Sequence, residues 1–193
     1  MPQRLPTPGT RRLFVCLLAD APRRQAIERL RTDWHWPSHR WWTEPDRLHV
    51  TVADPLYFTP AELISLQVAL SSLRFAPFVL RLRRARVSAS HLGLQAEPCL
   101  FFKALQTQVA QLARQAGAPF QHWPTPHVTL SRHAGGLASP PLDQPIDWLV
   151  AEVLLVWSQL KADVGRRHYK VLARYEADSA LQQSEAQQLV FGF

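Results

Sequence analysis

The tetrapeptide His49-Val50-Thr51-Val52 returns in the second half of the chain as His127-Val128-Thr129-Leu130, so a His-apolar-Thr-apolar unit occurs twice. Successive side chains of an extended strand point to opposite faces, so each histidine shares one face with its threonine while the apolar residues face a core. Two such strands side by side would bring two imidazoles and two hydroxyls together. The repeated unit therefore predicts the centre of the fold and a candidate site.

The segments that flank the two units carry strand and helix signals in turn. An apolar run at Arg12–Leu18 predicts a strand, and Asp20 followed by Pro22 predicts the start of a helix. Thr59-Pro60-Ala61-Glu62 has the capping-box pattern of a second helix start. The other predicted elements are strands at Arg40–Trp42, Arg47–Val52, Phe78–Arg83, Val87–Leu94, Asp147–Trp157 and His168–Tyr175, and a helix over Pro98–Ala116 with Phe101, Leu105, Val109 and Leu112 as its buried stripe.

The order of these elements predicts an α+β fold rather than a doubly wound sheet. Each His-Thr strand follows a segment that contains a helix, as a duplicated lobe would give. We therefore expect residues 1–193 to form a single bilobal domain, with antiparallel sheets flanked by helices and an active-site cleft between the lobes. The ten N-terminal residues and the Gln-rich tail from Asp178 would be peripheral.

The chain is basic, with 22 Lys and Arg residues against 15 Asp and Glu residues and a formal charge of +7. The only lysines are Lys103, Lys161 and Lys170, and the planar fork of arginine suits phosphate better than a point charge does. An anionic partner is one interpretation of this composition. A generally arginine-rich protein is the other, because net charge bears on association rather than on fold.

The densest group of basic residues is Arg81, Arg83, Arg84 and Arg86. The alternation changes between positions 83 and 84, which predicts a β-bulge or the end of a strand. One interpretation is a solvated edge strand on which charge prevents aggregation; the other is contact with an RNA backbone.

Cysteine usage and hydropathy bear on the compartment. Cys16 and Cys99 lie in apolar surroundings, which favours buried thiols in a reducing cytoplasm over a disulfide framework. The chain shows no apolar signal core and no run near the roughly 20 residues that span a bilayer, so we expect no membrane association. His35 and His39 are separated by Pro37, which prevents the helical face that a metal site of this spacing would use.

The paired motif suggests acid–base chemistry. A neutral imidazole can take a proton from water and a protonated one can deliver a proton to a leaving oxygen near neutral pH. Threonine hydroxyls can hold the phosphate between them, and a strained 2′,3′-cyclic phosphate would need no metal ion. The alternative is two unrelated strand histidines. His91 also lies in a strand-like segment, but Gly93 stands where the motif has threonine, so we expect a structural role for His91.

The motifs and their flanks resemble the RNA 2′,3′-cyclic phosphodiesterases, also called 2′-5′ RNA ligases, of the two-histidine phosphoesterase superfamily. The similarity runs from Arg12 to about Tyr175. It is carried by Arg12-Leu13-Phe14-Val15, by Trp42 through His49-Val50-Thr51-Val52, by Pro126-His127-Val128-Thr129-Leu130-Ser131-Arg132, and by Leu155–Leu160 with Tyr169-Lys170-Val171-Leu172-Ala173. After the first motif the family has a small apolar-plus-glycine segment, whereas this chain has Ala53-Asp54-Pro55-Leu56.

The resemblance implies a role for each motif residue. His49 would be the proton donor and His127 the proton acceptor, Thr51 and Thr129 would hold the phosphate, and Arg132 would bind substrate from the end of its strand. The bilobal domain would be a phosphoesterase domain. The reaction would be hydrolysis of 2′,3′-cyclic phosphate ends of RNA or nucleotides to 2′-phosphates, by a monomer that needs no metal or other cofactor. The alternatives are 2′-5′ RNA ligase activity and a non-catalytic RNA-binding module.

Overall fold

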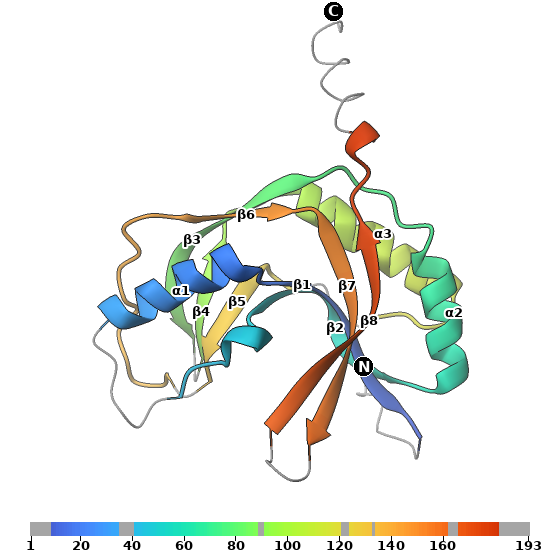
Figure 1. Cartoon of the computed structure of the whole chain (residues 1–193), viewed down its shortest axis with the longest axis horizontal. Helices are drawn as coiled ribbons and strands as arrows, with labels where there is room; N and C mark the ends of the chain where they lie inside the picture. The colour runs from blue at the N-terminus through green and yellow to red at the C-terminus, as the bar shows by residue number, and fades with distance from the viewer. Residues whose placement is uncertain are drawn as a thin grey trace, which may run out of the picture.

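Alternating apolar and polar side chains build one antiparallel sheet, seen in a computed structural model that describes residues 9–34, 41–88, 91–120, 124–132, 134–161 and 166–181. The described strands are β1 (Arg11–Leu18), β2 (His49–Phe58), β3 (Phe78–Ser88), β4 (His91–Ala96), β5 (His127–Ser131), β6 (Ile146–Val150), β7 (Glu152–Lys161) and β8 (Arg166–Glu176). The helices are α1 (Ala21–Asp33), α2 (Pro60–Leu70) and α3 (Leu100–Gln115), with a 3₁₀ turn η1 (Pro45–Arg47). The strand order is β6-β3-β4-β5-β2-β1-β7-β8 (Figure 1).

The sheet has two related halves that meet where β2 pairs with β5. In one half, β1 and β2 are antiparallel neighbours connected through α1; in the other, β4 and β5 are antiparallel neighbours connected through α3. A strand–helix–strand unit that ends in a His-Thr strand thus occurs twice. The predicted α+β fold with two lobes is confirmed, and the lobes share one continuous curled sheet (Figure 1).

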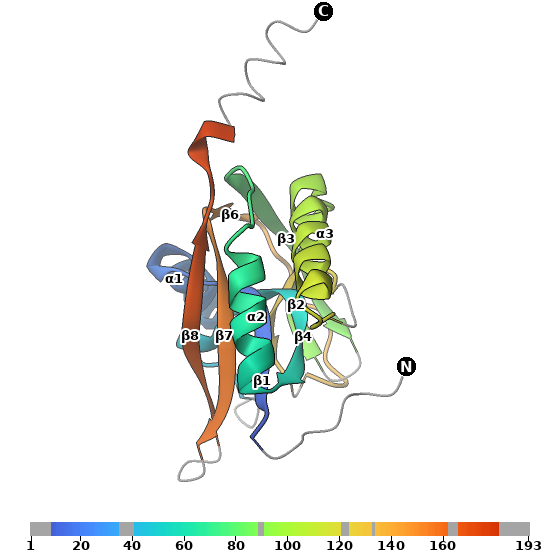
Figure 2. The ribbon, with the colours of Figure 1, turned by 90° about the vertical axis from the view of Figure 1, so that its right-hand side faces the viewer.

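The helices cover different parts of the sheet. α2 and α3 pack against each other and against β2 (Figure 2), whereas α1 contacts β6 and η1. The apolar residues of the two motifs face this core, and Val50, Val128 and Leu130 have no exposed surface. Burial of each such side chain contributes about 1.5–3 kcal/mol. The central strands are therefore anchored by the residues that alternate with the motif polar groups.

Two helix starts agree with the sequence prediction. The Asp20 carboxylate accepts a hydrogen bond from the backbone N–H of Arg23 over 3.0 Å at the start of α1. At the start of α2, the Thr59 hydroxyl accepts from the Glu62 N–H over 3.3 Å, while the Glu62 carboxylate accepts from the Thr59 N–H over 2.7 Å. This reciprocal pair is the predicted capping box.

Several predicted strand boundaries are wrong. Of the predicted strand Arg40–Trp42, Arg40 lies outside the described residues, and Trp42 makes one isolated bridge to Ser131. β2 continues to Phe58, six residues beyond the predicted end at Val52. The predicted strand Asp147–Trp157 is two strands, β6 and β7, because the segments before and after Ala151 pair with different strands, β6 with β3 and β7 with β1 and β8.

The strand that carries the arginine cluster also differs from prediction. β3 runs without interruption to Ser88, and its register against β4 shifts between Leu82 and Arg84, which confirms the predicted bulge. β6 pairs only with Phe78–Leu82, so Arg81 lies within the sheet, whereas Arg83, Arg84 and Arg86 lie beyond the end of β6 on the part of β3 that pairs with β4. The interpretation of an edge strand therefore holds for these three arginines and not for Arg81. In α3 the buried face includes Phe102 rather than the predicted Phe101, which is 52% exposed and stacks on Phe78.

The remaining predictions fall partly outside the described residues. Residues 1–8, 35–40 and 182–193 lie outside them, and with them most of the N-terminal leader, His35, His39 and the tail after position 181. No helix in the described ranges is long and apolar enough to cross a membrane. Cys16 is buried and Cys99 is partly buried, and both are free thiols.

Candidate active site

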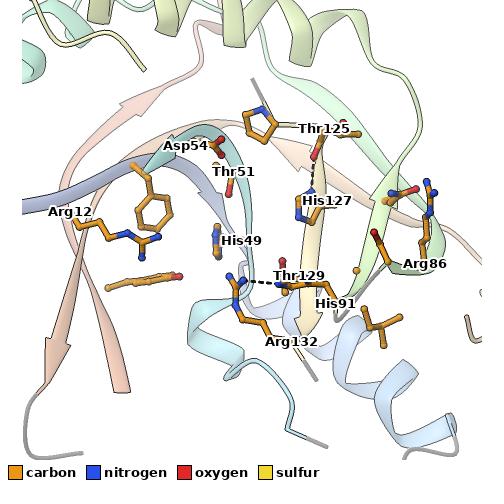
Figure 3. A pocket seen from close by; sticks show the side chains of 17 residues that line it. Arg12, His49, Thr51, Asp54, Arg86, His91, Thr125, His127, Thr129 and Arg132 are labelled. Carbon is orange, nitrogen blue, oxygen red and sulfur yellow. Dashed lines mark hydrogen bonds between the residues drawn. The ribbon is translucent and has the colours of Figure 1, made fainter. Parts of the chain in front are cut away.

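The two motifs meet at the centre of the sheet. Val50 of β2 pairs with Val128 of β5 in antiparallel register. That register places His49 across from Thr129 and Thr51 across from His127, on the face opposite the valines. All four polar side chains line one cavity of about 550 Å³ (Figure 3). The structure therefore brings together the four residues that the repeat singled out.

The two imidazoles are held in the same way. Nδ1 of His49 lies 2.7 Å from the carbonyl oxygen of Arg47, two residues earlier. Nδ1 of His127 lies 2.7 Å from the carbonyl oxygen of Thr125, also two residues earlier (Figure 3). A carbonyl oxygen only accepts, so Nδ1 donates in both rings. The second ring nitrogen, Nε2, is then the atom at which each imidazole can take up or release a proton.

Aromatic side chains enclose His49. Its ring centroid lies 5.2 Å from that of Phe14 and 5.4 Å from that of Tyr169, whose ring plane is nearly perpendicular to it at 81°. Burial lowers the pKa of His49 to about 4, with a smaller lowering from the charge of Arg132. His49 is therefore neutral at pH 7 in the unliganded protein, and an anion bound against it would favour its charged form.

Arg132 reaches the cavity from the end of its strand. β5 ends at Ser131, and the Arg132 guanidinium lines the cavity and donates from Nη1 to Nε2 of His91 over 3.1 Å (Figure 3). The prediction from sequence gave His91 no place in the site, but it stands on the cavity wall. The alternation His91-Leu92-Gly93-Leu94, with both leucines buried, is the signal that could have found it.

The neighbouring strand β4 forms the part of the cavity wall next to His127. Gly93 pairs with Thr129 and Gln95 pairs with His127. A Cβ atom at Gly93 would lie 3.3 Å from the carbonyl oxygen of Val128 and 3.5 Å from Cδ2 of His127. The glycine therefore allows β4 to lie close to the carbonyl oxygen of Val128 on β5, beside the His127 ring.

The cavity is positively charged. Its described lining residues include three arginines, Arg12, Arg86 and Arg132, and one carboxylate, Asp54. Asp54 reaches the wall because the register of β2 against β1 shifts next to Ala53, which is buried. Such a cavity favours an anionic ligand. In the described part of the chain, no three His, Cys, Asp or Glu side chains group so that they could hold a metal ion.

The sequence comparisons found no relative of this chain, whereas the structure comparison found proteins with a similar fold. No protein-family model matches the chain, and the search of curated proteins found no match. Solved structures do match. The Escherichia coli LigT structure with 3′-AMP has 23% sequence identity and a TM-score of 0.76 over 87% of this chain and 98% of LigT. TT0787 of Thermus thermophilus has 24% identity and a TM-score of 0.70 over 86% of this chain and 97% of its own.

A third structure is more distant. The MHV ns2 PDE domain has 12% identity and a TM-score of 0.52 over 76% of this chain and 98% of its own. The similarity to LigT and TT0787 extends over nearly their whole length. The protein therefore has the same fold as LigT and TT0787.

Proposed function

We propose that this protein is an RNA 2′,3′-cyclic phosphodiesterase, which opens the cyclic phosphate at the end of an RNA or nucleotide to a 2′-phosphate and a 3′-hydroxyl. The observation that carries the proposal is the matched pair of imidazoles, each with Nδ1 donating to a backbone carbonyl, across one positively charged cavity. Support also comes from the structural neighbours, since LigT has been crystallised with 3′-AMP and with phosphate.

In the proposed reaction, Nε2 of His127 takes a proton from water. The water oxygen forms a bond to phosphorus while the bond from phosphorus to O3′ breaks, and Nε2 of His49 gives its proton to O3′. Each group of this kind is worth about 10² to 10⁴ in rate. Thr51 and Thr129 donate hydrogen bonds to the non-bridging oxygens, each beside the histidine of the other strand.

The substrate itself helps to charge the proton donor. Burial keeps His49 neutral in the free protein, with a pKa of about 4. A bound phosphodiester anion next to the ring offsets that desolvation, so His49 gains its proton together with the substrate. In this proposal, Arg132 binds a phosphate oxygen and limits how far the pKa rises.

The same residues serve a related reaction. A 5′-hydroxyl of a second RNA in place of water would give 2′-5′ RNA joining, with His127 taking the proton of that hydroxyl and His49 giving its proton to O3′; the roles exchange only when the 2′-5′ bond is cleaved. A non-catalytic RNA-binding module would keep the cavity and its charge without turnover. Product analysis separates the three functions, because only hydrolysis yields a free 2′-phosphate from a mononucleotide.

The decisive experiment is incubation with a 2′,3′-cyclic mononucleotide in excess EDTA, followed by phosphorus NMR. We expect conversion to the 2′-phosphate in wild type, no conversion in His127→Gln, and wild-type conversion in His168→Gln, which removes an exposed histidine outside the cavity. A 3′-phosphate product, or activity lost in EDTA and restored by a divalent ion, would overturn the mechanism.

The proposal extends to the state of the protein. We propose that residues 1–193 act as one bilobal domain, as a monomer and without a cofactor. The two free thiols support a reducing, cytoplasmic location. Light scattering at micromolar concentration and a single unfolding transition in urea test the monomer and the single domain.

A further inference from the structure

The arginine cluster of β3 lies on the same face of the sheet as the active site. The burial pattern of β3 changes at the bulge, so that Arg83 and Arg84 are both exposed although they are adjacent. Beyond the bulge, Arg86 and Ser88 line the active-site cavity. The bulge therefore turns Arg84 and Arg86 towards that face, while Ala85 packs against the core.

The four arginines have different partners. Arg81 donates two hydrogen bonds to the carboxylate of Asp147, at 2.7 and 3.0 Å. Arg83 lies 3.3 Å from a carboxylate oxygen of Glu97. These two positive charges are compensated on the surface. Arg86 borders the active-site cavity, and Arg84 borders a second depression.

This second depression, here called the Arg84 depression, adjoins the active site. It has a volume of about 450 Å³ and is lined by Arg83, Arg84, Gln95, Ala96, Glu97 and Pro98. Gln95 lines both the Arg84 depression and the active-site cavity. The two hollows therefore meet at a single side chain.

Strand pairing aligns the two depressions. Arg84 of β3 pairs with Gln95 of β4, which pairs with His127 of β5. Neighbouring strands lie about 4.8 Å apart, so two strand spacings of roughly 10 Å separate the backbones of Arg84 and His127. A nucleotide step together with the length of an arginine side chain covers this distance.

We propose that the Arg84 depression binds the phosphodiester that joins the terminal nucleotide to the one before it. The preferred substrate is then the 3′ end of an RNA chain of at least two nucleotides, whereas a cyclic mononucleotide fills the active-site cavity alone. Arg84 supplies the charge, and the Gln95 amide sits between the two phosphates. This inference rests on the proposed function for the terminal cyclic phosphate, but binding tests it without turnover.

The test is fluorescence anisotropy with a 5′-labelled RNA trinucleotide that ends in a 3′-phosphate, at several salt concentrations. Arg84→Gln should weaken binding about tenfold and should reduce the slope of log affinity against log salt by about 0.7, the value for one phosphate contact on a single strand. The matched control, Arg114→Gln, removes the same charge from the exposed end of α3 and should change neither quantity.

Competition by a 3′-mononucleotide completes the experiment. The affinity of the mononucleotide should be equal in wild type and Arg84→Gln, because a mononucleotide does not reach the Arg84 depression. The inference is overturned if Arg84→Gln weakens binding of the trinucleotide no more than Arg114→Gln does. It is also overturned if Arg84→Gln weakens binding of the mononucleotide as much as binding of the trinucleotide. Selective loss of trinucleotide binding without any hydrolysis in wild type would support the depression and refute the proposed function instead.

Discussion

Arg132 donates a hydrogen bond from Nη1 to Nε2 of His91 over 3.1 Å, which ties the residue after β5 to the first residue of β4. A guanidinium has no acceptor, so Nε2 of His91 accepts and its proton is on Nδ1. The contact fixes the fork of Arg132 at the cavity wall. His91 is thus a positioning residue for a group that, in the proposed function, binds phosphate.

Substitutions at His91 should therefore act on substrate binding. His91→Leu leaves Arg132 without this acceptor, and we expect KM to rise about 3- to 10-fold with kcat within twofold. His91→Gln keeps an acceptor oxygen and should restore most of the affinity. Steady-state kinetics with a 2′,3′-cyclic nucleotide check both variants. A loss in kcat that His91→Gln does not restore would contradict a positioning role.

The two motif histidines should each be indispensable. His49→Ala and His127→Ala should each lower kcat by about 10² to 10⁴, the usual worth of one acid–base group. The double variant should be little worse than either, since groups that act as one unit are not additive. Circular dichroism confirms folding, and His168→Ala serves as the control. If His91→Ala were the most damaging of these changes, the assigned pair would be incorrect.

The sequence predicted the centre of the fold because the information there is local. The alternation within His49–Val52 and His127–Leu130 defines which side chains share a face, whatever the strands pair with. The caps at Asp20 and Thr59 are also local, and the structure confirms both. The pairing of two similar strands over one cavity then follows from burial of their apolar faces.

The rest of the site depends on pairing between distant segments. Gln95 and His91 belong to the cavity because β4 lies beside β5 and extends only from His91 to Ala96, bounds that the sequence pattern missed. Asp54 lines the cavity because of a register shift against β1, a partner strand that sequence alternation does not reveal. The bulge at Arg83 was visible in sequence, but the face to which it turns Arg84 was not.

Gly93 tests how tightly the site is packed. Gly93→Ala places a methyl group 3.3 Å from the backbone oxygen of Val128 and 3.5 Å from the His127 ring. The contact with the carbonyl oxygen is the tight one, whereas the ring is in ordinary van der Waals contact, so β4 and β5 must separate by a few tenths of an ångström and His127 moves with its strand. We expect kcat to fall about 10-fold or more, because small displacements of catalytic groups are costly. A lower kcat at unchanged KM would support this; wild-type kcat would show that the ring tolerates the methyl group.

The last prediction concerns the dependence of stability on pH. The folded-state pKa of His49 is about 4, below the unfolded value of about 6.5, because the ring is desolvated against Phe14 and Tyr169. Between these values the unfolded chain binds more protons, so the contribution of His49 to the free energy of unfolding decreases as the pH falls from 6.5 to 4. The full shift corresponds to at most about 3 kcal/mol.

His49→Gln should remove this contribution. Between pH 7 and pH 4 the wild type should lose about 2–3 kcal/mol of unfolding free energy relative to His49→Gln. Urea denaturation of both proteins at each pH measures this difference. Groups that titrate in both proteins cancel in the difference. His168→Gln, at an exposed site, should follow the wild type. A pH-independent difference for His49→Gln would mean that His49 keeps an ordinary pKa, and the free protein would then already hold a charged proton donor at pH 6.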